Sequence, residues 1–223
     1  MVILGLTGSI GMGKSTAART FRLLGVPVYD SDATVHRLLG RGGRAVAAVE
    51  AAFPGVARGE QIDRQELAKR VFGDAAALAR LEKILHPQVR RAMLDFLKRQ
   101  GRARRPVVVL DIPLLFETGG ERLCDAVVVV SAPPSVQASR VLMRPGMTRA
   151  RFEAILATQM PDREKRRRAD FVVQTARSRR ETLRCISALV TVMRRRAGRH
   201  WPPPWRAPPR SAAISTYRGK CHA

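Results

Sequence analysis

Cysteines, aromatic residues and long apolar runs are all scarce in this sequence, and each shortage excludes a class of protein. The three cysteines are scattered, with no Cys-x-x-Cys pair, which fits a reducing cytoplasm better than a disulfide framework or a zinc site. Apolar runs such as Ala126–Val130 are strand-sized, far below the roughly 20 residues that cross a bilayer, so we expect no membrane span. No basic leader precedes the first apolar residues, so we expect no secretory signal.

Acidic residues are also few, at 18 against 41 lysines and arginines, which gives a formal net charge of +23. Residues 194–223 carry eight of these bases and no acid, yet the rest of the chain remains strongly basic. Positive charge would speed the arrival of polyphosphates, although solubility or a general preference for arginine would explain it equally well. Aromatic residues make up 5% of the chain and we find no reading module, so nucleic acid is not the expected partner.

Short apolar runs that are typical of strands alternate with helical patterns along the chain. The strand candidates are residues 2–6, 26–29, 106–110, 126–130 and 171–173. Helical spacing over Ser15–Leu24 lies between the first two runs, so the chain begins with a βαβ unit, which closes right-handed in nearly all cases. The alternation predicts an α/β fold, with helices on both faces of one sheet.

A glycine-rich loop directly follows the first strand candidate. Residues 8–15 read Gly-Ser-Ile-Gly-Met-Gly-Lys-Ser and match the pattern G-x-x-x-x-G-K-[ST] completely. In such a P-loop the backbone N–H groups and the following helix bind phosphates, Lys14 reaches the β and γ phosphates, and Ser15 is placed to ligate Mg²⁺. The residues expected to bind ATP here are Gly8, Gly11, Met12, Gly13, Lys14, Ser15 and Thr16. The motif predicts nucleoside triphosphate binding, but ATPases, GTPases and small-molecule kinases all share it.

Residues 33–103 have a helical pattern and are too many for a simple crossover between strands, so we interpret them as an insertion that holds the acceptor. Asp63 is predicted to be a helix N-cap, with Glu66 in capping-box position. Pro87 interrupts a long helical stretch, and we expect it in the first turn of a new helix that runs to Gln100.

Carboxylates at the ends of strand candidates could serve the chemistry. Asp30 and Asp32 follow the second run, where an aspartate could accept the proton of an attacking hydroxyl, or could simply cap a helix. Asp111 ends the third run and reads as a carboxylate that holds Mg²⁺ through water, the alternative being a turn residue. Arg140 and Arg144 share a helix face in the arginine-rich segment 134–168, which we interpret as a closing lid, although any one arginine could be an exposed surface group.

Taken together, these stretches resemble the dephospho-coenzyme A kinase family. Besides the P-loop, the resemblance rests on Asp30-Ser31-Asp32, His86-Pro87-Gln88-Val89-Arg90, Asp111-Ile112-Pro113-Leu114-Leu115-Phe116-Glu117, Gln137, Arg140, Gln159, Pro161, Lys165 and Ala169-Asp170. It covers roughly residues 2–196. The family often has an asparagine or aspartate and a glycine after Val173, whereas this chain has Gln174-Thr175-Ala176.

The resemblance implies a kinase that uses ATP and Mg²⁺ to phosphorylate the ribose 3′-hydroxyl of dephospho-coenzyme A. It implies a five-stranded parallel core (1–32, 104–133 and 169–196), a helical substrate region (33–103) and a lid (134–168). Asp32 falls where the family places its general base, and Arg140 where a lid arginine contacts ATP. The acceptor would be gripped by His86, Arg90, Leu114, Leu115, Phe116 and Glu117. The alternative is another P-loop kinase, acting on a nucleotide or small metabolite.

The last residues, 197–223, are rich in proline and arginine, extend past the usual end of the family, and are expected to be a disordered tail. The sequence leaves open whether the chain acts as a monomer or as a homo-oligomer.

Overall fold

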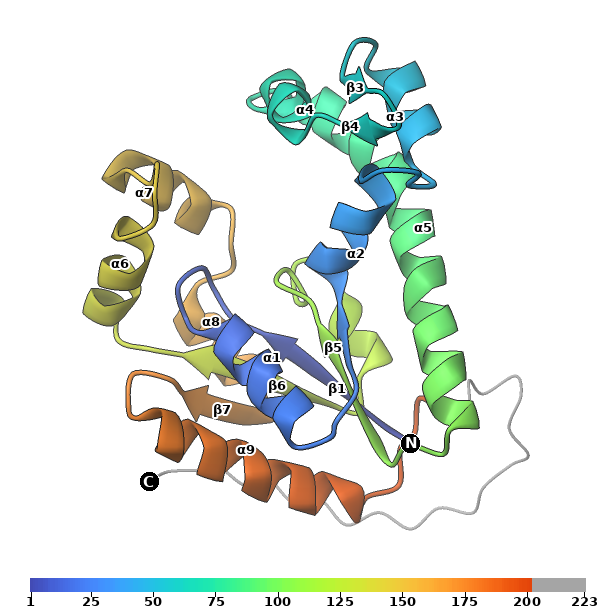
Figure 1. The fold of residues 1–223 in the computed structure, drawn as a ribbon. Coiled ribbons are helices and arrows are strands. Elements are labelled where there is room, and N and C mark those ends of the chain that lie inside the picture. Colours follow the sequence, from blue (N-terminus) through green and yellow to red (C-terminus); the bar gives the residue numbers. More distant parts are fainter. Residues whose placement is uncertain (202–223) are drawn as a thin grey trace. The chain divides into compact units, whose positions relative to one another are not determined.

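The structure is a computed structural model that describes residues 1–201 (Figure 1). These residues form two compact units, of which one comprises residues 1–29 together with the chain from residue 100 onward, and the other residues 30–99. Of the predicted tail, residues 197–223, the part from 202 to 223 lies outside the described residues. Along residues 1–201, no helix combines the length and the apolar character that a membrane span requires.

The first unit is built on a five-stranded parallel sheet with flanking helices, as predicted. The strand order is β2-β5-β1-β6-β7. The strands are β1 (Val2–Thr7), β2 (Val28–Asp30), β5 (Val107–Asp111), β6 (Ala126–Ser131) and β7 (Phe171–Gln174). The helices are α1 (Lys14–Leu23), η1 (Gly120–Leu123), α6 (Pro134–Leu142), α7 (Arg149–Ala157), α8 (Asp162–Arg168) and α9 (Arg179–Arg194).

The register of the central strands brings their carboxyl ends to one edge of the sheet. Leu6 of β1 pairs with Asp111 of β5, and Thr7 pairs with Val129 of β6. Residues that follow β1, β5, β6 and β7 therefore meet at this edge, where parallel α/β sheets bind their ligands.

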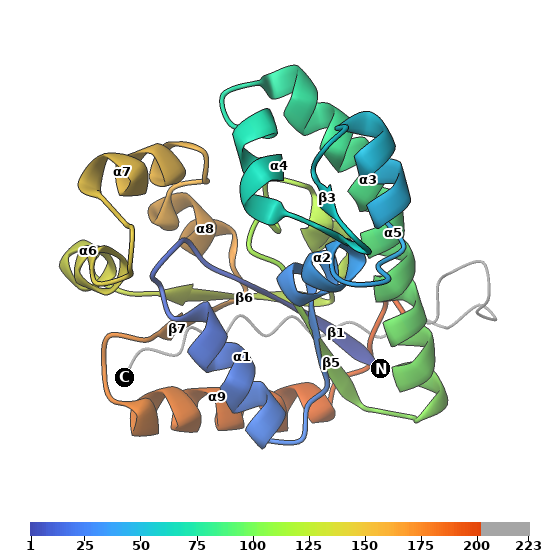
Figure 2. The same ribbon diagram turned by 45° about the horizontal axis from the view of Figure 1, so that its top comes forward.

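Apolar side chains on both faces of the sheet explain why its strands are continuous hydrophobic runs. On one face, Val2, Leu4 and Leu6 join a core with side chains of α1 and α9, which lie side by side (Figures 1 and 2). On the other face, Ile3 is also almost fully buried. The expectation of a sheet covered on both faces is confirmed.

The second unit is mainly helical, and its own apolar core includes Val49, Phe53 and Leu81. Its elements are α2 (Ser31–Leu39), α3 (Val46–Ala52), β3 (Ala57–Arg58), β4 (Gln61–Ile62), α4 (Arg64–Val71) and α5 (Ala75–Arg102), the last of which continues beyond the unit. The short β3–β4 hairpin was not expected, because strands of two residues leave no period in the sequence. Asp63 caps α4 as predicted, accepting hydrogen bonds from the N–H groups of Gln65 and Glu66.

The prediction that Pro87 begins a new helix is wrong. Helix α5 runs without a break from Ala75 to Arg102, with Pro87 in its interior. A proline inside a helix destabilises it because it removes one backbone hydrogen bond, but favourable packing of the helix can offset this loss. Leu81 and Leu85, on the turns before Pro87, are buried in the core of the second unit, and this packing holds the helix together.

Candidate active site

The phosphate loop leaves β1 at the ligand-binding edge of the sheet and leads directly into α1. Gly11 and Gly13 have φ values of 78° and 86°, in the left-handed region that favours glycine. Gly13 is the N-cap of α1, and because it has no side chain it leaves the N–H groups of the first turn to an anion. Ser15 and Thr16 follow in that turn and are exposed. The loop therefore has the form that the motif predicted.

The side chains of Lys14 and Asp111 meet at this edge. The Lys14 Nζ lies 2.8 Å from the Asp111 Oδ1, and the two side chains are 16% and 4% exposed. Asp111 is the last residue of β5, whose neighbour β1 ends at the phosphate loop, so the strand register brings the pair together. A lysine held against a carboxylate next to a phosphate loop can turn to the phosphates when they bind, which leaves the carboxylate available to a cation.

Arg140, from the last turn of α6, reaches the phosphate loop. Its NH1 donates to the carbonyl oxygen of Gly11 at 3.5 Å and to the Oγ1 of Thr175 at 3.1 Å, and its NH2 donates to the carbonyl oxygen of Thr175 at 2.7 Å. Arg144 lies one turn further on, after the end of α6, and is exposed. The structure thus brings Arg140 to the loop, while the backbone N–H of Arg144 donates to the carbonyl oxygen of Val141 at the end of α6.

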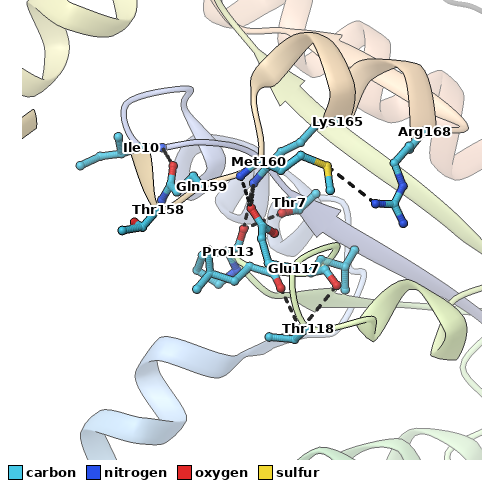
Figure 3. Close-up of polar contacts among 12 residues, drawn as sticks. Thr7, Ile10, Pro113, Glu117, Thr118, Thr158, Gln159, Met160, Lys165 and Arg168 are labelled. Carbon is cyan, nitrogen blue, oxygen red and sulfur yellow. Dashed lines mark hydrogen bonds and ion pairs between the residues drawn. The ribbon is translucent and has the colours of Figure 1, made fainter. Parts of the chain in front are cut away.

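Two glutamines hold the phosphate loop at Ile10. The Nε2 of Gln137, in α6, donates to the carbonyl oxygen of Ile10 at 2.8 Å. The Oε1 of Gln159, between α7 and α8, accepts from the N–H of Ile10 at 3.0 Å (Figure 3). Both polar groups of one loop residue are therefore bound by the arginine-rich segment. Both glutamines were among the residues of the family resemblance, but no role was predicted for them.

The segment after β5, residues 113–117, is attached both to β1 and to α8. The Oγ1 of Thr7 donates to the carbonyl oxygen of Pro113 at 2.8 Å. The Oε1 of Glu117 lies 2.9 Å from the Nζ of Lys165 and accepts from the N–H of Met160 at 2.8 Å (Figure 3). Lys165 has no exposed side-chain surface, and the Glu117 side chain is 19% exposed. Lys165 was named in the family resemblance without a role, and in the structure it is a buried partner of Glu117.

The electrostatics of Glu117 follow from these contacts. Burial raises the pKa of its carboxyl group, but the hydrogen bonds from Lys165 and from the Met160 N–H outweigh it, so the pKa lies below its ordinary value of 4.5. In the same segment Leu115 and Phe116 are buried, and Leu114 is 40% exposed. The guanidinium of Arg168 lies 4.6 Å from the centre of the Phe116 ring, a cation–π contact.

The remaining predicted acceptor residues lie in the second unit. Asp30 caps α2 by accepting from the N–H of Ala33 at 2.9 Å, so for this aspartate the capping interpretation is confirmed. Asp32, in the first turn of α2, is exposed. His86 and Arg90 are one turn apart on α5 and both are exposed. The first unit thus assembles the phosphate loop, Lys14, Asp111 and Arg140, and the second unit carries these acceptor candidates.

Thr175 was missed as a functional candidate. It directly follows β7 at the ligand-binding edge, and its side chain contacts the loop and Arg140. The position of Thr175, just after a strand candidate, could have identified it as a functional residue. Because Gln174-Thr175-Ala176 differs from the family pattern, it was interpreted only as a mismatch to that pattern.

Comparisons with known proteins agree on one family. The family model described as "Dephospho-CoA kinase" matches residues 2–181. A dephospho-CoA kinase from Paramagnetospirillum magneticum is 64% identical, over 87% of this chain and 92% of its own length. One from Rhodospirillum rubrum is 59% identical, over 90% of this chain and 95% of its own length.

Solved structures give the same picture of the fold. The crystal structure of TT1252 from Thermus thermophilus is 38% identical, covers 86% of this chain and 96% of its own, and has a TM-score of 0.76. A dephospho-CoA kinase from Campylobacter jejuni covers the same shares of the two chains, with a TM-score of 0.61. At 23% identity that likeness concerns the fold alone.

Proposed function

The chain belongs to the dephospho-CoA kinase family, and we propose how its residues divide the work of that reaction. The enzyme transfers a phosphoryl group from ATP to dephospho-coenzyme A, giving coenzyme A and ADP in the last step of coenzyme A biosynthesis. The runner-up interpretation, a kinase of another nucleotide or metabolite, is not favoured by these relatives. We base the roles on one observation: the glycine loop, Lys14, Asp111 and Arg140 lie together at one edge of the sheet.

ATP is proposed to place its phosphates in the loop of residues 8–16. The backbone N–H groups and the start of α1 supply fixed partial positive charge, which costs no reorganisation as charge develops on the transferring group. Lys14 would leave Asp111 and neutralise the β and γ phosphates, while Arg140, already on the loop, stabilises the charge that spreads over the phosphoryl oxygens. Arg144 is proposed as a more peripheral contact to ATP.

Mg²⁺ fits the residues at this edge. Magnesium is usually bound by one or two protein oxygens together with substrate phosphates and water, so a dedicated cage is not needed. Within residues 1–201 there is no group of three or more His, Cys, Asp and Glu that could hold a metal. We propose that the Ser15 hydroxyl and, through water, the Asp111 carboxylate hold the ion, which would neutralise phosphate charge.

The acceptor hydroxyl is proposed to lose its proton to Asp32. This carboxylate is exposed, and it comes two residues after β2, the edge strand beside β5. Asp30 caps α2, and Asp32 falls where the family places its general base, so we propose Asp32 for this role. The cationic side chain of Arg90 and the imidazole of His86 are proposed to bind the acceptor, together with the exposed Leu114.

Leu115, Phe116 and Glu117 are proposed to shape the acceptor segment. Leu115 and Phe116 are buried, and the Glu117 carboxylate bonds Lys165 and Met160. Their contribution to acceptor binding is therefore to fix the backbone of residues 113–117. Because the enzyme consumes ATP and its cysteines are scattered, we also propose that it works in the cytoplasm.

Two substitutions test these roles in an assay of ADP release with dephospho-coenzyme A. Asp32→Asn should lower kcat by about 100-fold or more while ATP still binds, because a general base contributes about 10²–10⁴-fold. The matched control Asp95→Asn, at a partly exposed position of α5, should keep kcat within a factor of two of the wild type, roughly the scale of surface substitutions. A near-normal kcat for Asp32→Asn would remove Asp32 from the role.

The second substitution is Lys14→Ala, which should weaken ATP binding and lower kcat, because it removes the only side-chain cation that the motif directs at the β and γ phosphates. Unchanged kinetics would overturn the loop assignment. A panel of other hydroxyl acceptors, offered with ATP, should give ADP release only with dephospho-coenzyme A.

A further inference from the structure

Thr175 connects three parts of the site that are far apart in the sequence. Its Oγ1 donates to the carbonyl oxygen of Met12 in the phosphate loop at 2.7 Å. The same oxygen accepts from the NH1 of Arg140 at 3.1 Å, and the Thr175 carbonyl oxygen accepts from the NH2 of Arg140 at 2.7 Å. Its N–H donates to the carbonyl oxygen of Ser131, at the end of β6, at 2.9 Å. The donor and acceptor capacity of the hydroxyl is thus used within the site.

Packing also holds Thr175 in place. The side chain is buried, with 6% of the residue exposed. A Cβ added to Gly13 would lie 2.8 Å from the Oγ1 of Thr175 and 3.0 Å from its Cβ, so the threonine lies directly against the last glycine of the loop. The start of α1 therefore has its position fixed from the side by this residue.

These contacts of Thr175 restrict the side chain of Arg140. An arginine side chain has about 2 kcal/mol of rotamer entropy to lose when it is fixed on a ligand. Here two hydrogen bonds to Thr175 have already fixed the guanidinium, and a 3.5 Å contact to the Gly11 carbonyl oxygen places it on the phosphate loop. Contacts within the protein therefore place Arg140 at the phosphate loop.

We propose that Thr175 is a positioning residue of this kinase, which holds Arg140 over the phosphate loop. This inference rests on the role proposed for Arg140 in binding ATP phosphates. Preorganised cations stabilise a developing charge without reorganisation at the moment of transfer, so the hydroxyl of Thr175 acts on the reaction through Arg140.

Thr175→Val and Thr175→Ser test the proposal as a matched pair. Valine keeps the shape and removes the hydroxyl, whereas serine keeps the hydroxyl and removes only the methyl group. Because the carbonyl of Thr175 still bonds the NH2 of Arg140, valine should lower kcat/KM for ATP by about 10-fold, the effect of one lost hydrogen bond to a charged group. Serine should stay within about 3-fold of the wild type, and KM for dephospho-coenzyme A should change little in both variants.

A double-mutant cycle separates positioning from general damage. In an Arg140→Ala background, Thr175→Val should lower kcat/KM for ATP by less than about 2-fold, because the group through which it acts is gone. Equal losses with and without Arg140, or equal losses for valine and serine, would overturn the proposal. Calorimetric titration with Mg-ATP should show the same non-additivity in Kd. This titration needs no acceptor, so its result would still test the role of Thr175 if the proposed roles of the acceptor residues were wrong.

Discussion

Replacement of Lys165 by methionine should destabilise the protein strongly, because it leaves a carboxylate without its cation. Lys165 has no exposed side-chain surface and lies 2.9 Å from Glu117, whose side chain is 19% exposed. Removing one partner of a buried ion pair typically costs about 3–5 kcal/mol. Glu117 keeps its hydrogen bond from Met160 and some contact with water, so we expect a loss of about 3 kcal/mol, at the lower end of that range.

Urea unfolding measures this loss as a lower midpoint at an unchanged m-value. The double variant Lys165→Met, Glu117→Gln removes both charges and should recover at least about 1 kcal/mol relative to the sum of the two single losses. Lys98→Met is the control, since this lysine is 50% exposed and lies 3.9 Å from Asp95, and its effect should stay within about 0.5 kcal/mol. A neutral Lys165→Met, or strictly additive losses in the double variant, would refute the reasoning.

Two further predictions concern pH and the end of the described chain. Because the pKa of Glu117 is lowered from its ordinary 4.5, the carboxylate adds stability that is fully present above pH 4.5 and is lost as the pH falls through the lower folded value. The difference in unfolding free energy between wild type and Glu117→Gln should therefore be constant from pH 7 to 5 and shrink below that; a difference constant down to pH 3 would contradict it. Asp125 accepts from the N–H groups of Ile3, Arg199 and His200. Asp125→Ala should therefore cost about 1–3 kcal/mol in urea unfolding and make the chain near Arg199 easier to cleave by trypsin, and an unchanged proteolysis rate would count against this anchor.

Residues 198–201 were expected to belong to a tail, and in the structure they lie against the domain. A Cβ on Gly198 would collide with the carbonyl group of Met1, and one on Gly101 would lie 2.5 Å from the Nε1 of Trp201. Their backbone is held by Asp125, on the turn before β6. The composition of this segment predicted that it would not pack. The residues that it contacts, among them Gly101 and Asp125, are far from it in the sequence, so no local pattern indicated the contact.

Elements with a strong local pattern were predicted well. The strands are continuous apolar runs, and the phosphate loop is defined by eight adjacent residues. The cap at Asp63 depends only on its neighbours along the chain. The single helix through Pro87 was missed because the cost of proline is local, whereas the packing of Leu81 and Leu85 that offsets it is tertiary.

The sequence by itself determined that this chain binds a nucleoside triphosphate on a glycine loop and that it resembles one kinase family, because the loop is local and the family motifs are short strings at fixed distances. Only the tertiary structure decided that Thr175 holds Arg140, that Lys165 is buried against Glu117, and that Gln137 and Gln159 bind Ile10. The physical reason is that each of these contacts joins residues 35 to 149 positions apart, and the strand order and helix packing alone bring them within hydrogen-bond distance.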